Sequence, residues 1–168
     1  MHRKDFRKLH IVAETVQPEK IIHASALTAG NCGDPQMLIP LLEGLVGPNG
    51  EVSGDKGYPS RRNAQYIRDR GAKSYLMLKD NARSRSNGFP AWREMVLERI
   101  EKPSLFEKHY HRRSNNESVN STWKRWFGDS LRSRKRWNQR RETTWKKAVY
   151  NLRHLIRFRL RTRITRGI

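Results

Sequence analysis

Four side chains suited to phosphodiester chemistry share one face of a predicted helix. Tyr110, Arg113, Glu117 and Lys124 are separated by steps of three, four and seven residues, which follow the helical repeat. A carboxylate flanked by cations can hold a divalent ion beside a phosphodiester. The same row is also typical of a solvated salt-bridge ladder on an exposed helix. The spacing alone therefore leaves two readings, a metal-dependent site and a charged surface.

A second candidate carboxylate, Asp55, follows the short run Glu51–Ser53 and Gly54. The run predicts a strand, and ligands in α/β proteins meet the sheet where strands end. The alternative is an ordinary turn residue, because Gly-Asp-Lys-Gly is good turn chemistry.

Three stretches of the chain resemble the DDE transposases of prokaryotic insertion sequences, in the group marked by a Tyr-Arg-Glu-Lys signature. The glutamate-bearing stretch reads NNESVNSTWKRWFGDSLRSRK, and the stretch around Asp55 reads SGDKGY. The third stretch, KLHIVAETVQPEKIIHASALTAGNCGDPQML, resembles the two strands and helix that lie between the first two aspartates of the family. The resemblance covers about residues 8–158.

The resemblance implies an α/β fold with a ribonuclease H-like mixed sheet flanked by helices. It also implies three carboxylates that hold two Mg²⁺ or Mn²⁺ ions, which cut DNA and join it to a target. Asp55 and Glu117 would be catalytic metal ligands. Arg113 and Lys124 would hold DNA phosphates, and Tyr110 would position a strand end.

The first aspartate of the family has no clear match, because only MHRKDF precedes the matched region. Asp5 is the one early candidate, but it lies among basic residues without a strand to fix it. We therefore expect residues 1–168 to form a single partial domain that begins inside a longer transposase. The first strand of its sheet would be missing, and the fragment would be inactive alone.

The charge of the chain favours a polyanionic partner. The sequence holds 36 Lys and Arg against 16 Asp and Glu, for a net charge of +20. The excess is largest from Ser121 to Ile168. This stretch contains a predicted basic helical part, residues 128–168, in which Arg132, Arg134, Lys135 and Arg136 are candidate DNA contacts. Two other functions stay open, a non-catalytic basic nucleic-acid-binding protein and a nuclease of the same fold.

The partners implied are the DNA of element ends and target, and a homodimer is possible because two ends are cut. No run of about 20 apolar residues and no secretory leader is found, so no membrane is expected and the protein is placed in the prokaryotic cytoplasm. The single cysteine, Cys32, excludes an internal disulfide, and the usual zinc sites cannot be built.

Apolar patterning predicts the elements that carry these residues. Residues 9–14 and 21–27 read as a hairpin, and Asp34 before Pro35 reads as the cap of a helix that Pro40 should distort. Capping explains Asp34, with catalysis as the alternative because the family has an aspartate at this place. A strand at 51–53, a helix at 60–70 and a strand at 74–78 predict a right-handed parallel crossover.

The second half of the chain is predicted to be mostly helical. Residues 79–88 read as a loop, and two helices follow, one through Trp92 to Ile100 and the signature helix at 105–127, which Gly128 ends. Trp123 and Trp126 are expected to pack against the sheet, with stacking on an unpaired base as the alternative. A last helix carries an apolar stripe that we expect to pack on the sheet or on the signature helix: Trp145, Val149, Leu152, Ile156 and Leu160.

Overall fold

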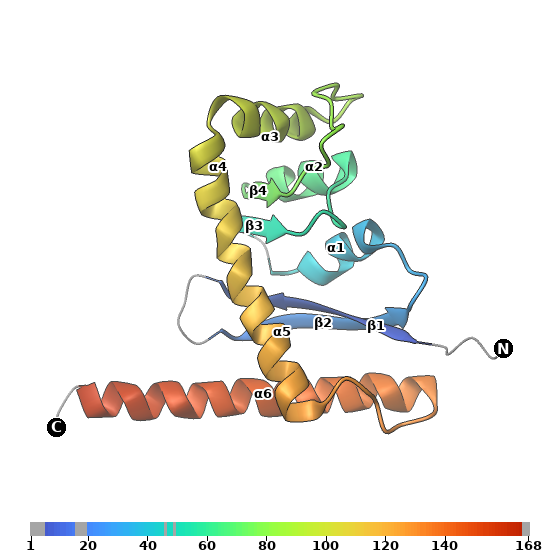
Figure 1. The fold of residues 1–168 in the computed structure, drawn as a ribbon, viewed down its shortest axis with the longest axis vertical. Helices are drawn as coiled ribbons and strands as arrows, with labels where there is room; N and C mark the ends of the chain where they lie inside the picture. Colours follow the sequence, from blue (N-terminus) through green and yellow to red (C-terminus); the bar gives the residue numbers. More distant parts are fainter. Residues whose placement is uncertain (1–5, 16–19, 46, 49, 166–168) are drawn as a thin grey trace. The chain divides into compact units, whose positions relative to one another are not determined.

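The computed structural model describes residues 6–15, 20–45, 47–48 and 50–165. They form an α/β structure (Figure 1). Its residues divide into two compact units. Unit 1 combines residues 1–30 with residues 115–168, and unit 2 is the continuous stretch of residues 31–114. Asp5 and residues 17–19 of the predicted hairpin turn, QPEK at residues 17–20, lie outside the described residues.

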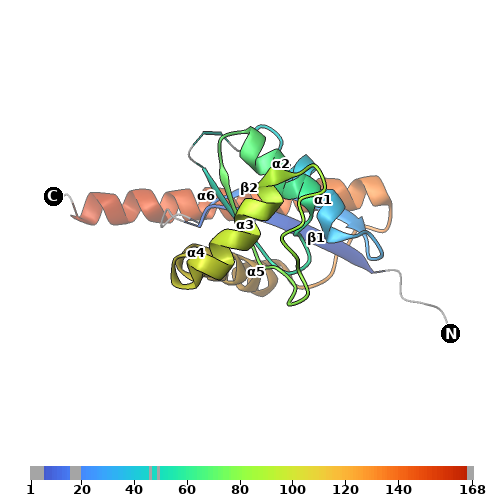
Figure 2. The same ribbon diagram turned by 90° about the horizontal axis from the view of Figure 1, so that it is seen from above.

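Unit 1 begins with the predicted hairpin. Strand β1 (Arg7–Ala13) pairs antiparallel with β2 (Ile22–Ala29), in a register that sets Arg7 opposite Ala29. The remaining elements of this unit are α5 (Ser114–Phe127) and the long helix α6 (Arg136–Thr165). Helix α6 lies against β2, as both ribbon views show (Figure 1, Figure 2).

The core of unit 1 joins the hairpin to both helices. Its buried members are Ile22, Val119, Trp123 and Tyr150, with Trp126 packed against them. The ring of Trp123 lies 5.0 Å from that of Phe127 and 6.3 Å from that of Tyr150. The prediction that Trp123 packs in the core is therefore confirmed.

The predicted packing of the apolar stripe on α6 is wrong. Trp145 is 69% exposed and Leu152 is 59% exposed, and the other stripe residues are exposed as well. The helix instead buries a face that carries Thr143 and Tyr150, whose ring stacks on that of His154 at 4.4 Å. Periodicity correctly predicts a helix with an apolar face, but here aromatic stacking and polar contacts select another face for burial.

Unit 2 contains the predicted strand–helix–strand order. Strand β3 (Glu51–Gly54) pairs in parallel with β4 (Lys73–Leu76), and α2 (Arg61–Asp69) connects them. Ser60 caps α2 by accepting a hydrogen bond from the backbone N of Asn63 at 3.1 Å. Gly71, at a φ of 74°, follows the helix in the left-handed region that favours glycine.

Helices cover this parallel pair. Helix α1 (Asp34–Leu42) precedes β3, and α3 (Pro90–Glu101) and α4 (Pro103–Tyr110) follow the loop at 79–88. Pro40 lies inside α1, which ends two residues later. The buried core includes Ile67, Leu76, Met95 and Phe106.

The signature helix is not one uninterrupted α-helix, contrary to the prediction. It begins at Pro103, and a 3₁₀ turn, η1 (His111–Arg113), separates α4 from α5. The carboxylate Oε2 of Glu51 accepts a hydrogen bond from Nη1 of Arg112, within this turn, at 2.6 Å. The same oxygen pairs with Nδ1 of His109, in α4, at 2.9 Å. These polar contacts hold the turn to β3, and helical spacing alone does not reveal them.

The strand pairing also differs from the predicted single mixed sheet. Among the described residues the strands form two sheets, the antiparallel pair β1–β2 and the parallel pair β3–β4. The α/β class is confirmed.

Candidate functional site

Asp55 stands at the end of β3, where the chain turns sharply. The backbone N of Tyr58 donates to the O of Asp55 at 2.9 Å and closes the turn. The carboxylate Oδ1 of Asp55 accepts the N–H of Lys56 at 2.7 Å, and the residue is exposed. The local geometry therefore presents a carboxylate to solvent from a hydrogen-bonded turn.

A buried asparagine fastens this turn to α1. Asn63 is only 2% exposed, and its Nδ2 donates to the O of Tyr58 at 2.8 Å and to the O of Pro35 at 2.9 Å. One side chain thus links the turn after Asp55 to the first residues of α1. Buried amide donors that are satisfied in this way hold loops in one position.

Asp34 does not cap α1, so the predicted capping role is wrong. Gly33 is the N-cap residue and makes no side-chain cap bond, while Asp34 is the first helical residue. Its carboxylate instead lies against the Asp55 turn, since a Cβ added at Gly57 would fall 2.5 Å from Asp34 Oδ2. Because the carboxylate lies near the N-terminus of α1, the helix dipole still stabilises its negative charge.

The pKa of Tyr58 reflects burial and the negative charge of two carboxylates near this turn. Burial, followed by the negative charges of Asp34 and Asp55, raises the pKa of its hydroxyl to about 12. Two carboxylates of unit 2 therefore act on the same phenol, one from the start of α1 and one from the end of β3.

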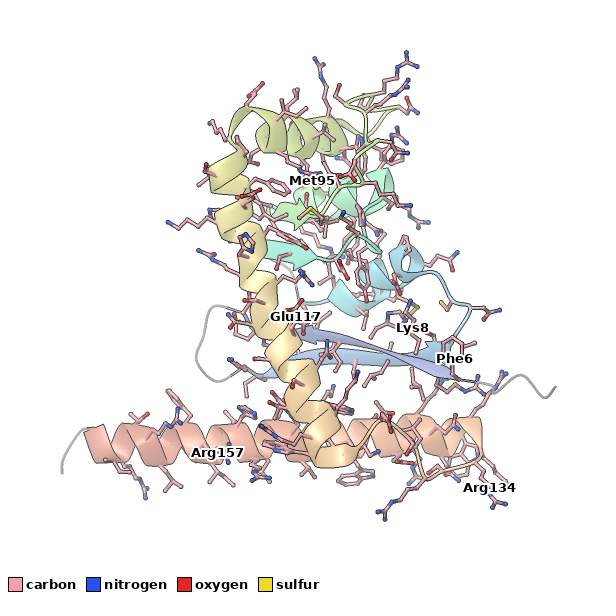
Figure 3. All side chains as sticks on the ribbon, in the orientation of Figure 1. Phe6, Lys8, Met95, Glu117, Arg134 and Arg157 are labelled. Carbon is pink, nitrogen blue, oxygen red and sulfur yellow. The ribbon has the colours of Figure 1, made fainter. Side chains whose placement is uncertain are left out.

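Glu117 lies in the first turn of α5 and is exposed (Figure 3). The signature row is divided between the units, because Tyr110 and Arg113 belong to unit 2 whereas Glu117 and Lys124 belong to unit 1. Each carboxylate is placed within its own unit, and the approach of Glu117 to Asp55 stays a prediction.

The two signature residues of unit 2 pack on each other. Tyr110 is 6% exposed, and the guanidinium carbon of Arg113 lies 5.2 Å from its ring centroid. A tyrosine this well covered contributes to the core of unit 2, and its predicted role in positioning a strand end is untested.

The four cations of residues 128–168 that are predicted to contact DNA are all exposed. Arg132, Arg134 and Lys135 precede α6, and Arg136 is its first residue. Glu142 holds this segment by accepting the backbone N–H of Arg132 at 3.1 Å and that of Ser133 at 2.9 Å. Burial opposes ionisation of Glu142, but these bonds and the one from Lys146 lower its pKa to about 2.

The donor chemistry suits the metal that the resemblance implies, because Mg²⁺ prefers carboxylate oxygens. Asp55, Asp34 and Glu117 supply such oxygens from exposed or half-buried positions. Within the described part of the chain, however, no three His, Cys, Asp or Glu side chains gather as a metal site. The carboxylates thus fit the ion by the type of their donor atoms alone.

Sequence reasoning missed Asn63, and it included Gly57 and Tyr58 in the turn and motif around Asp55 without giving either a contact of its own. A weak signal existed for Asn63, which stands three residues after the capping Ser60, but polar residues are common in first helical turns. Its two carbonyl partners come from separate segments, so only the folded structure identifies it.

No helix in the described ranges combines the length and the apolar character that a membrane crossing requires. No curated protein and no solved structure matches the chain. A family model described as "Transposase DDE domain" matches residues 2–152.

Proposed function

Since the chain belongs to the transposase DDE domain family, we propose that it takes part in metal-dependent cleavage and transfer of DNA strands. The observation that carries the proposal is the family match over residues 2–152, which contains both Asp55 and Glu117. The turn that presents Asp55 from the end of a strand supports it, because a ligand must stand on a rigid element to act.

Asp55 and Glu117 would hold Mg²⁺ or Mn²⁺ through their carboxylate oxygens. When bound, such ions activate a water or a DNA 3′-hydroxyl and stabilise charge on the phosphoryl oxygens. Lys124 and Arg113 would bind DNA phosphates near the cut. Tyr110, although covered, would act through its packing with Arg113.

The family uses three carboxylates, and the motifs of this chain match two of them. We therefore expect the isolated chain to cleave DNA slowly, because attacking and leaving oxygens need both ions held in place. Asp5 and Asp34 are the two side chains whose substitution would show whether either one serves as a third ligand.

A test that does not require turnover is local cleavage of the protein backbone by bound Fe²⁺ in the presence of ascorbate and peroxide. Fe²⁺ replacing Mg²⁺ should cut the chain near residue 55 and near residue 117. Asp55→Asn and Glu117→Gln should each suppress both cuts, because the two carboxylates share the ion. The matched controls Asp80→Asn and Glu101→Gln, both at exposed positions, should leave the pattern unchanged.

The outcome that contradicts the proposed site is cutting near only one of the two residues, or cutting that neither variant changes. A parallel assay with supercoiled plasmid and a pre-cut element end, in Mg²⁺ or Mn²⁺, measures nicking and joining. Activity that survives Asp55→Asn and Glu117→Gln would reject the transposase mechanism.

A second candidate is non-catalytic DNA binding, which the net charge of +20 and the exposed cations before α6 favour. It predicts DNA binding that is unaffected by divalent ions and by both carboxylate substitutions. We further propose that the partner DNA includes element ends and target, that a homodimer handles the two ends, and that the protein is cytoplasmic.

A further inference from the structure

The solvent-facing side of α6 carries a narrow apolar row, which we call the seam. Its members are all exposed and follow one another at spacings of four, three and four residues: Trp145, Val149, Leu152 and Ile156. At about 100° per residue, the seam occupies only about 60° of the helix circumference. Thr143 and Tyr150, through which α6 is buried, lie on the other side of the helix.

The shape of the seam suits a second α-helix. Alternating spacings of three and four residues in a narrow row are the pattern by which one helix packs along another. The seam extends over about three turns, or about 17 Å. The next two positions of the same row are Arg159 and Arg163, so the apolar row ends in charge. A lipid surface that took up the seam would need a broad apolar face without such an interruption.

Uncompensated positive charge surrounds the seam. Helix α6 holds ten Lys and Arg and one acidic residue, Glu142, which is already paired with Lys146 at 2.9 Å. Arg153, Arg159 and Arg163 are exposed, and in the described ranges no acidic side chain pairs with any of them. These guanidinium groups are therefore available to carboxylates of a partner.

Arg153 is held at one edge of the seam. On the helix it neighbours Val149, four residues before it, and Ile156, three residues after it. Its guanidinium carbon lies 4.2 Å from the ring centroid of Trp126, which restricts the side chain. A partner carboxylate at this edge would thus meet a cation that is already positioned.

Two other occupants satisfy only half of these requirements. A second copy of α6, packed seam to seam, would set cations against cations, and like charges across an interface oppose binding. DNA would pair with the cations through its phosphates, but it would leave most of the apolar seam in water. An occupant that meets both requirements is apolar along one stripe and acidic beside it.

We propose that the seam binds an amphipathic α-helix of a different protein. Apolar side chains of this partner pack on the seam, and its carboxylates pair with Arg153, Arg159 and Arg163. This mode of recognition lays the apolar face of one helix on an apolar surface of the other protein. The interaction goes beyond the proposed function, because it uses none of the predicted metal ligands and needs no DNA.

The test uses two synthetic helical peptides as probes, each of about 18 residues, so that they exceed the length at which isolated helices are marginal. Both carry a row of Leu at the spacings of the seam on an Ala-rich background, and they have either Glu or Gln beside that row. Calorimetry at several temperatures measures their binding to the chain. The Glu peptide should bind about tenfold more tightly than the Gln peptide. Its binding should show a negative heat-capacity change, which marks apolar burial.

Two matched pairs of variants localise the binding. Ile156 and Ile164 are both exposed on α6, but only Ile156 belongs to the seam. Ile156→Gln should weaken binding of the Glu peptide about tenfold, and Ile164→Gln less than about twofold. Arg159→Gln should weaken binding of the Glu peptide about threefold without affecting the Gln peptide, whereas Arg140→Gln, an exposed cation away from the seam, should change neither.

Equal losses for Ile156→Gln and Ile164→Gln, or equal affinities for the two peptides, would overturn the proposal. A dimer of the parent chain in light scattering that Ile156→Gln dissociates would assign the seam to a second copy instead. Binding to phosphatidylglycerol vesicles with a blue-shifted emission that Trp145→Phe abolishes, in the absence of peptide binding, would assign the seam to a lipid surface and also overturn the proposal.

Discussion

Asn151 pairs with Ile22 through two hydrogen bonds. Its Oδ1 accepts the backbone N–H of Ile22 at 2.9 Å, and its Nδ2 donates to the backbone O of Ile22 at 2.9 Å. A side-chain amide on α6 thus takes the place of a neighbouring strand at the first residue of β2. Ile22 is 1% exposed, so few other partners can reach its peptide groups.

We predict that Asn151→Ala lowers the free energy of unfolding by about 2–4 kcal/mol, because two buried backbone groups lose their partners. Asn138→Ala on the same helix makes a suitable control, with an expected change within about 0.5 kcal/mol. Urea unfolding measures both. Equal effects would mean that the loss reflects helix propensity and that the pairing contributes little.

The two tryptophans Trp123 and Trp145 should differ sharply in their contribution to stability. Trp123 is 6% exposed in the core of unit 1, whereas Trp145 is 69% exposed on α6. Trp123→Ala should cost about 3–5 kcal/mol, and Trp145→Ala about 0.5 kcal/mol or less. A large loss of stability in Trp145→Ala would show that the apolar stripe is buried in solution.

Glu142 should make stability depend on acid pH. Its pKa falls from 4.5 to about 2 in the folded chain, so the stabilisation is fully present above pH 4.5 and is lost as the pH falls towards 2. Glu142→Gln should be less stable at neutral pH and should flatten this dependence, as unfolding at a series of pH values would show. Glu101→Gln, at an exposed position, provides the control, and parallel curves for Glu142→Gln and the parent chain would contradict the assignment.

The hydroxyl of Tyr58 should ionise at a higher pH than that of an ordinary tyrosine. Its pKa is raised to about 12 from 10.0, so its contribution to stability is complete below pH 10 and is lost as the pH rises through 12. Asp34→Asn should lower this pKa, because it removes the negative charge of Asp34, which raises the pKa more than the charge of Asp55 does. Absorbance of the phenolate follows the titration, with Tyr58→Phe identifying the signal. An unchanged titration in Asp34→Asn would show that the charge of Asp34 does not contribute to the shift.

DNA binding should depend steeply on salt through the exposed cations before α6. If about six phosphates are contacted, the log–log slope should be near −5. Replacing Arg132, Arg134, Lys135 and Arg136 by Gln should flatten the slope to about −2. The control replaces four exposed cations of unit 2 by Gln: Arg62, Lys79, Arg83 and Arg93. An unchanged slope in the first variant would place the DNA elsewhere.

Local patterns in the sequence were sufficient to predict most elements. Alternation and turn residues predicted the hairpin, and Ser60 and Gly71 correctly bounded the helix between the parallel strands. These signals are local, and in these elements tertiary contacts do not override them.

What could not be predicted depends on contacts between distant segments. Asp34 has good capping chemistry, but the turn around Gly57 draws its carboxylate away from the helix end. The stripe through Leu152 has correct helical spacing, yet Tyr150 and Asn151 orient α6 through partners more than 20 residues distant. For the candidate site, motif resemblance identified Asp55, whereas Asn63 required the structure.

The division of the chain has a consequence for its synthesis. Unit 2 is one continuous stretch, residues 31–114. The hairpin of unit 1 instead packs on helices from residues 115–168, which are synthesised later. At about 5–20 residues per second, roughly 6–25 s separate the emergence of the hairpin from that of α6 on the ribosome. A two-stranded hairpin is marginal in water by itself, so unit 2 should fold first during translation, and the hairpin, although synthesised before unit 2, should become stable after it.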